Sequence, residues 1–252
     1  MKLAIMQPYF YPYLGYFQLI KAVDKFILYE NVNFRKASWM TKNVILAKKA
    51  NPFYIYVPVE SRSSNKRISE IKIFAYKKWQ EKLINLIHHN YYQSKYYHEI
   101  KQRLDKIIYT ETDSLHTYNS KTICMIAELL GITTKIDSEN THYLEMENQL
   151  QLKYQKKQTG QSIQPMQRKT ERVILIAKQE NADVFINAIG GSLLYSKTEF
   201  AQNNIDLFFI KTNNYNYKQS SEAFFSGLSI IDVLMNCGIE GTIELLNHFE
   251  LE

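Results

Sequence analysis

The chain has 252 residues and a formal net charge of +6, from 31 Lys and Arg against 25 Asp and Glu. At 45% hydrophobic and 22% charged residues it can bury a core, which excludes disordered, collagen-like and coiled-coil proteins. Its two cysteines, Cys124 and Cys237, are too few and too far apart for a disulfide framework or a paired zinc site. We therefore expect a globular protein of the reducing cytoplasm.

The charge and hydropathy patterns argue against nucleic acid and membranes. Basic residues are mixed with acidic ones along the chain, whereas nucleic-acid binders usually gather them in one stripe. Pro8 and Pro12 interrupt the apolar N-terminus, and no uncharged run approaches the roughly 18 apolar residues that cross a bilayer. The sequence predicts no nucleic-acid partner and no transmembrane segment.

The N-terminal region alternates strand, loop and helix. Lys2 to Met6 is a short apolar run stopped by Pro8, which predicts a buried strand. Pro12 can open a helix over Tyr13 to Ala22, and Lys25 to Tyr29 is a second buried strand. This order predicts a mostly parallel, Rossmann-like α/β sheet with a ligand crevice beyond the carboxyl ends of its strands.

The remaining patterns extend the α/β prediction. Further strands are expected over residues 52–59, 68–73, 132–136, 184–187 and 207–211, and helices over 77–89, 97–108, 115–130, 170–179, 198–203, 228–236 and 239–249. Residues 79–131 read as a helical insertion. Residues 139–167 are polar, with Gly160 and Pro165 as breakers, and predict a long mobile loop. We expect a single α/β domain over residues 1–252.

The first candidate site follows the first strand. Tyr9, Tyr11, Tyr13 and Tyr16 lie within eight residues, directly after Gln7. Tyrosine rings stack on sugar or base faces and still offer a hydroxyl, so Gln7, Tyr9, Tyr13 and Tyr16 are candidate substrate-binding residues. Ordinary packing of a tyrosine-rich helix is the alternative. Several nucleotidyl-transferring α/β families carry two histidines at this helix start, and their absence here disfavours that activity.

The second candidate site follows the second strand, in the segments YENVNFR and SWMTKN. Glu30 could accept a proton from an amine or hydroxyl, and Arg35 or Lys42 could face a phosphate. Other candidate substrate-binding residues here are Asn33, Trp39 and Asn43. The alternative is a surface loop in which the asparagine side chains form the hydrogen bonds of turns.

The third candidate site is the segment NAIGG, which follows a predicted strand. Paired glycines such as Gly190 and Gly191 let backbone N–H groups approach an oxyanion closely, although most such pairs are tight turns. Asn187 precedes them as a candidate substrate-binding residue.

Three segments resemble the WbqC-like family. The run IMQPYFYPYLGYFQLIKAVDKFILYENVNF resembles the opening signature of that family, and FINAIGGSLLY and LSIIDVLMNCG resemble its later blocks in the same order. The resemblance covers essentially the whole chain. It implies a bacterial protein encoded among genes for O-antigen or other surface-polysaccharide synthesis.

The resemblance also carries residues over by position, and it adds Arg172 to the candidate substrate-binding residues. The matching positions are Gln7, Pro8, Tyr9, Pro12, Tyr13, Gly15, Tyr16, Asn33, Trp39, Asn43, Arg172, Asn187, Gly190, Gly191, Tyr195 and Asp232. Glu30 and Asn31 stand where a pair of aspartates is expected, and Ser196 stands where an acidic residue is common. The first departure weakens any two-carboxylate or metal mechanism, so we expect no metal.

The resemblance implies acylation or aminoacylation, such as glycylation, of the amino group of a nucleotide-linked amino sugar. Glu30 would act as the base, and the Gly190 and Gly191 amides would steady the oxyanion. No bound cofactor is expected; the activated acyl donor would be coenzyme A, an acyl carrier protein or an ATP-derived species. The alternative is a non-catalytic protein of the same pathway that binds a sugar nucleotide or glycan. Nucleotidyl transfer on the same fold is a third hypothesis.

Overall fold

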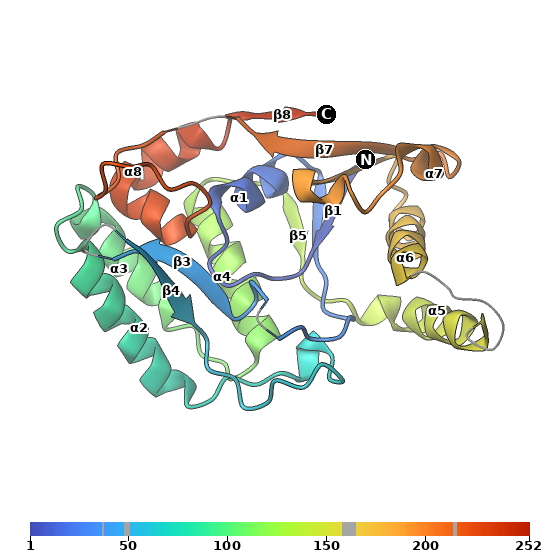
Figure 1. Ribbon diagram of the computed structural model, residues 1–252, viewed down its shortest axis with the longest axis horizontal. Coiled ribbons are helices and arrows are strands. Elements are labelled where there is room, and N and C mark those ends of the chain that lie inside the picture. Colours follow the sequence, from blue (N-terminus) through green and yellow to red (C-terminus); the bar gives the residue numbers. More distant parts are fainter. Residues whose placement is uncertain (37, 48–50, 158–164, 214–215) are drawn as a thin grey trace.

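A computed structural model describes residues 1–36, 38–47, 51–157, 165–213 and 216–252 (Figure 1). The strands are β1 (Lys2–Met6), β2 (Lys25–Leu28), β3 (Lys42–Leu46), β4 (Pro52–Tyr56), β5 (Lys135–Asp137), β6 (Val184–Ala188), β7 (Asp206–Thr212) and β8 (Phe249–Leu251). The helices are α1 (Leu14–Lys21), α2 (Tyr76–Tyr91), α3 (Tyr97–Ile108), α4 (Leu115–Leu129), α5 (Leu144–Lys157), α6 (Pro165–Gln179), α7 (Lys197–Ala201) and α8 (Ile230–Leu245). Short 3₁₀ helices are η1 (Ile68–Glu70), η2 (Thr141–Tyr143) and η3 (Ile189–Gly191).

The main sheet has the order β5-β2-β1-β6-β7-β8. All neighbours pair in parallel except β7 and β8, which are antiparallel. Counted along the main sheet alone, this is the doubly wound order 3-2-1-4-5-6, in which the chain direction across the sheet reverses between the first and fourth strands. The predicted mostly parallel Rossmann-like α/β fold is confirmed.

The sheet is buried on both faces because its strands alternate between two apolar clusters. Phe26 and Leu28 of β2 pack in a cluster that also contains side chains of α1, α4 and α8. Ile27 and Tyr29 pack in a second cluster with side chains of α6 and α7. A parallel sheet covered on both faces needs strands that are apolar at successive positions, as the KFIL sequence of β2 is.

The predicted insertion lies between β2 and β5 and contains the helices α2, α3 and α4. A separate antiparallel hairpin of β3 and β4 precedes the predicted insertion, and only its second strand was predicted. The strand predicted over residues 68–73 is wrong, because Ile68–Glu70 form the 3₁₀ turn η1. Ile73 and Lys72 make only isolated bridges there.

The loop predicted over residues 139–167 is replaced by helices on both sides of residues 158–164, which lie outside the described residues. Leu144–Lys157 form α5, and α6 begins at Pro165 rather than near Thr170. Figure 1 shows α5 and α6 together at one end of the molecule, opposite α2 and α3. The segment LEMENQLQLKYQKK is rich in Glu, Gln, Leu and Lys, whose straight side chains lose little freedom in a helix. Within the described part of the chain, no helix combines the length and the hydropathy needed to cross a bilayer.

Candidate functional site

The candidate site lies where β1 and β6 end side by side. β1 is followed by α1, which packs in the first apolar cluster, whereas β6 leads to α7, which packs in the second. The loops therefore leave the sheet toward opposite faces, and open α/β sheets bind ligands in the crevice that this divergence creates. The loop after β2 borders the same edge, because β2 pairs with β1 in parallel.

The loop after β1 presents tyrosines beside the crevice. The Tyr16 hydroxyl donates to the carbonyl of Gln7 at 2.8 Å, and the Tyr16 ring lies 5.5 Å from that of Tyr9. Tyr9 and Tyr13 are half-buried, and burial raises the pKa of both phenols. The Arg35 guanidinium opposes this rise in the pKa of Tyr9. Neutral phenols at this edge can donate hydrogen bonds to a ligand and offer ring faces to it.

Tyr11 holds the same loop in an unusual conformation. It is fully buried with a φ of 42°, in the left-handed region that bulky residues rarely adopt. Its hydroxyl lies 2.8 Å from that of Tyr118, and its carbonyl accepts hydrogen bonds from Asn43 and Ser229. Strained backbone of this kind persists only where its surroundings fix it, and it is common beside functional sites.

Asn43 lies underneath this loop. Its amide nitrogen donates to the carbonyls of Phe10 at 2.8 Å and Tyr11 at 2.7 Å, and its oxygen accepts from the Val44 N–H. The side chain is buried, so in this structure Asn43 joins β3 to the crevice loop. Its predicted contact with substrate stays a prediction.

Glu30 and His116 form a pair at the end of β2. A carboxylate oxygen of Glu30 lies 3.0 Å from Nδ1 of His116, and Oγ of Ser120 lies 3.3 Å from Nε2. His116 and Ser120 are one turn apart on α4 and are both buried, whereas Glu30 is partly exposed. The backbone N–H of Glu30 also donates to the side-chain oxygen of the buried Asn140. His116 thus holds the Glu30 carboxylate, and Asn140 holds its backbone.

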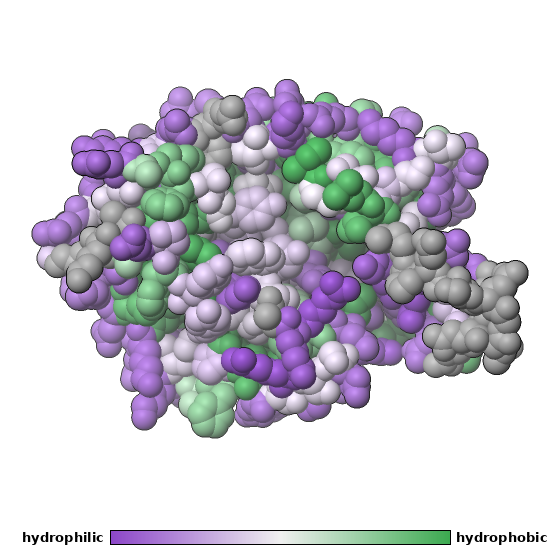
Figure 2. Space-filling view, in the orientation of Figure 1, coloured by the Kyte–Doolittle hydropathy of each residue, from purple (hydrophilic) through white to green (hydrophobic). Residues whose placement is uncertain are grey.

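The third loop follows β6. A Cβ at Gly191 would lie 2.5 Å from the side-chain nitrogen of Asn187, so a larger residue there would have to displace the Asn187 side chain. The Asn187 side chain accepts from the Ala188 N–H at 2.9 Å and is itself buried. Gly190 is exposed, with open space around it. Figure 2 shows apolar surface over this segment, which is orange in Figure 1.

Arg172 bonds an internal carboxylate, that of Glu147, near the end of β2. Two of its nitrogens bond both carboxylate oxygens of Glu147, and the Tyr29 hydroxyl donates to the same carboxylate at 2.5 Å. Burial lowers the pKa of Arg172, but the bonds to Glu147 outweigh it and the pKa is raised. The charge of Arg172 is therefore matched inside the protein by a buried carboxylate.

Of the remaining predicted residues, Asn33, Arg35 and Trp39 are exposed and Lys42 is half-buried. Asn33 forms an isolated antiparallel bridge with Arg67. Lys42 lies over the rings of Trp39 and Tyr54 on the β3–β4 hairpin. The structure therefore groups Gln7, Tyr9, Tyr13, Tyr16, Glu30, Asn187, Gly190 and Gly191 along one sheet edge, and places Trp39 and Lys42 on the neighbouring hairpin.

Sequence reasoning missed His116, Ser120 and Asn140 as partners of the second loop. The i, i+4 spacing of His116 and Ser120 on a predicted helix was visible, but nothing local connects them to Glu30, which precedes His116 by 86 residues. Glu147 was missed because it lay in the segment predicted to be a loop.

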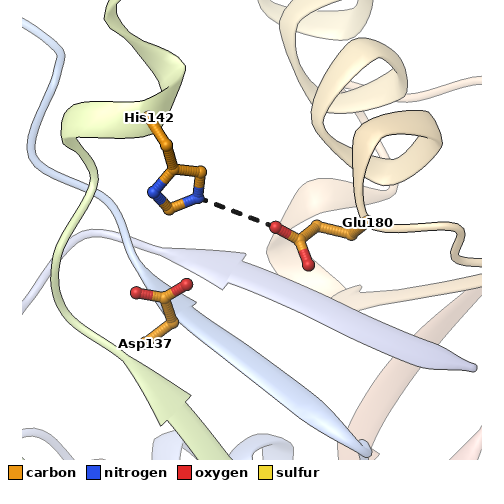
Figure 3. A group of neighbouring side chains, drawn as sticks. All are labelled: Asp137, His142 and Glu180. Atoms are coloured by element: carbon orange, nitrogen blue, oxygen red, sulfur yellow. Dashed lines mark ion pairs between the residues drawn. The ribbon is translucent and has the colours of Figure 1, made fainter.

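Asp137, His142 and Glu180 form a group that could hold a metal ion (Figure 3). However, the ammonium of Lys25 lies 3.0 Å from the Asp137 carboxylate and 2.7 Å from that of Glu180. Tyr143 also donates to Glu180 at 2.5 Å. The two carboxylates are already neutralised in part by an internal cation, which a metal would have to displace. The expected absence of a metal stays a prediction.

Comparisons with known proteins agree with the resemblance noted in the sequence. The model of the WbqC-like protein family matches residues 7–244. The chain is also similar to the uncharacterized protein Rv1507c of Mycobacterium tuberculosis (strain ATCC 25618 / H37Rv), with 26% identity over 242 residues and 95% of each chain covered. No solved structure gives a significant match.

Proposed function

This chain belongs to the WbqC-like protein family, and on that premise we propose that it is a transferase of bacterial surface-polysaccharide synthesis. Its substrate would be a nucleotide-linked amino sugar whose amino group receives an acyl or aminoacyl group. The single observation that carries the proposal is the Glu30 carboxylate, held 3.0 Å from the buried His116 at the end of β2. A carboxylate oriented at the ligand-binding edge of an α/β sheet is well placed for general base catalysis.

In the proposed reaction the sugar amine attacks the carbonyl carbon of an acyl thioester. A new C–N bond forms, Glu30 takes a proton from the attacking amine, and the thiolate leaves with the electrons of the broken C–S bond. The proton then passes from Glu30 to the thiolate, so the products are an amide and a free thiol. The amides of Gly190 and Gly191 would stabilise the negative oxygen of the tetrahedral intermediate.

His116 is proposed to position Glu30 rather than to touch the substrate. If the Ser120 hydroxyl donates to Nε2, then Nδ1 carries the hydrogen and donates to Glu30. This arrangement directs one carboxylate oxygen to the histidine and leaves the other for the amine. Tyr9 and Tyr13 would provide ring faces and hydroxyls for the nucleotide sugar.

The test uses the purified full chain with a panel of uridine- and thymidine-diphosphate amino sugars and acetyl coenzyme A, with amide formation followed by mass spectrometry. Glu30→Gln should lower kcat by about 100-fold or more with little change in KM, because it removes the base and keeps the shape. Glu128→Gln is the matched control, since Glu128 is exposed on α4. Full turnover by the Glu30→Gln protein would exclude Glu30 as the base.

The alternative is a binding protein of the same pathway without catalysis. It predicts that sugar nucleotides raise the melting temperature of the wild-type protein while no acyl donor yields an amide. If neither turnover nor a shift in melting temperature is seen with any nucleotide sugar, both functions are wrong.

A further inference from the structure

Tyr54 and Tyr56 of the β3–β4 hairpin, and Trp39 just before β3, are exposed aromatic residues that gather near Lys42. Trp39 is 44% exposed, Tyr54 45% and Tyr56 56%. The rings of Tyr54 and Tyr56 are nearly parallel, with centroids 6.0 Å apart and 29° between their planes. The ammonium of Lys42 lies 5.4 Å from the Trp39 ring centroid and 5.2 Å from that of Tyr54. We call these four side chains the aromatic platform.

The register of the hairpin places both tyrosines and Lys42 on one face. Lys42 pairs with Tyr56 and Val44 pairs with Tyr54, so these side chains point to the same side of the two strands. Ile55, between the two tyrosines, points to the opposite side and is buried in the core. Within β4 only Ile55 is buried, and both tyrosines are exposed.

Hydrogen bonds join Trp39 and the β3–β4 hairpin to the loop after β1. The Trp39 carbonyl accepts from the Phe10 N–H at 2.8 Å, and the Asn43 amide bonds the carbonyls of Phe10 and Tyr11. These bonds join the start of the hairpin to the loop after β1.

We propose that the aromatic platform binds a saccharide. A pyranose ring has an apolar C–H face, which suits exposed aromatic rings, and a rim of hydroxyls, which suits the tyrosine hydroxyls and an ammonium. Among the described residues, the Lys42 ammonium lies over two rings and forms no ion pair with a carboxylate, so it is also able to pair with an acidic sugar. The inference goes beyond the proposed function and does not depend on the activity of the Glu30 loop.

A protein partner fits this face less well. Covering Lys42 with an apolar surface would desolvate an ammonium that has no carboxylate partner in the described part of the chain, and unpaired buried charge is costly. A nucleic acid would need several cations along its backbone, and the platform offers one. A saccharide supplies hydroxyl oxygens to the ammonium without requiring that it be buried.

The experiment measures binding of two probes, a neutral hexasaccharide and a uronic-acid hexasaccharide, to the full chain by titration calorimetry and tryptophan fluorescence. The chain has two tryptophans, and Trp79 is buried, so a change in emission reports mainly on Trp39. Tyr54→Ala should weaken binding of at least one probe by tenfold or more, while Tyr54→Phe should keep it within threefold. Tyr109→Ala is the control, because Tyr109 is an exposed tyrosine outside the platform.

The outcomes separate this inference from the proposed function. Glu30→Gln should bind the probe as the wild-type protein does, even where turnover is lost. Equal binding by the wild-type protein and a Tyr54→Ala/Tyr56→Ala double variant would overturn the inference. So would the absence of binding to both probes, or a platform-dependent association with a protein or a nucleic acid in their place.

Discussion

At the level of single residues, the chain places an acid in one of its most enclosed positions. Asp232 is fully buried in the first turn of α8. Its two oxygens accept hydrogen bonds from the hydroxyls of Tyr91 at 2.7 Å and Tyr217 at 2.6 Å. Burial raises the pKa of this carboxyl above its ordinary value, although the two tyrosine bonds oppose the rise.

This raised pKa predicts a pH dependence of stability. The folded state binds the proton more tightly than the unfolded state, so the free energy of unfolding should fall as the pH rises from about 4 through the raised pKa. Asp232→Asn cannot titrate and keeps an acceptor oxygen. Its stability relative to the wild-type protein should therefore improve over this pH range, by at most about 1.4 kcal/mol per pH unit.

Urea unfolding at a series of pH values checks this expectation. Asp206→Asn, at an exposed position of β7, is the control and should give a curve parallel to the wild-type protein. If Asp232→Asn is also parallel to the wild type across the whole range, the carboxyl has the same pKa in the folded and unfolded states.

At the level of elements, local sequence predicted strands better than it predicted their partners. The KLAIM and KFIL runs are apolar and short, and both form strands of the parallel sheet. The KNVIL run of β3 was missed, because its pairing depends on β4 and on the loop under which Asn43 lies. Helix α5 was missed because a polar helix that packs mainly on α6 shows little amphipathic pattern.

The kink in α8 was read from sequence as a gap between two helices. Gly238 has φ 70° and ψ −173°, a conformation open essentially to glycine alone. A Cβ there would also lie 2.6 Å from the ring of Tyr96, which precedes α3. We predict that Gly238→Ala lowers the free energy of unfolding by about 1–3 kcal/mol from the backbone alone, with a further loss from the clash.

Two further variants separate these two contributions. Gly131→Ala has a similar φ of 66° but no atom within 4 Å of its Cβ, so it should cost about 1–2 kcal/mol. In a Tyr96→Ala protein the clash is absent, so Gly238→Ala should lower the free energy of unfolding only by the contribution of the strained backbone. Thermal or urea unfolding gives the values. An equal cost of Gly238→Ala in the wild-type and Tyr96→Ala backgrounds would show that the Tyr96 ring moves aside and that the clash adds nothing.

At the level of the whole molecule, the parallel α/β class follows from the alternation of strands and helices in the sequence. The strand order does not, because it depends on which apolar faces meet after the insertion between β2 and β5 has folded. The same insertion supplies His116 and Ser120 of α4 to the Glu30 loop. Because these contacts join residues far apart in the chain, the sequence predicted Glu30 but not the residues that contact it.

Lys25 joins the sheet to the helix layer on one of its faces. Its ammonium pairs with Asp137 at the end of β5 and with Glu180 just after α6, and all three side chains are at most 16% exposed. Burial alone would raise the pKa of Glu180, but its bonds to Lys25 and Tyr143 lower it. Lys25→Met should therefore cost about 3–5 kcal/mol of unfolding free energy, because two partly buried carboxylates lose their shared cation.

The same variant tests whether the internal ammonium occupies the place that a metal could take. In the Lys25→Met protein, Asp137, Glu180 and His142 offer oxygen and nitrogen ligands of the kind that Zn²⁺ prefers. Zinc should then raise the melting temperature of the Lys25→Met protein. At a free zinc concentration 100 times the dissociation constant, the gain in unfolding free energy is about 2.7 kcal/mol. It should leave the wild-type protein unchanged, and adding His142→Ala to Lys25→Met should abolish the effect. A zinc-induced rise in the wild-type protein would mean instead that the metal displaces Lys25 from between its two carboxylates.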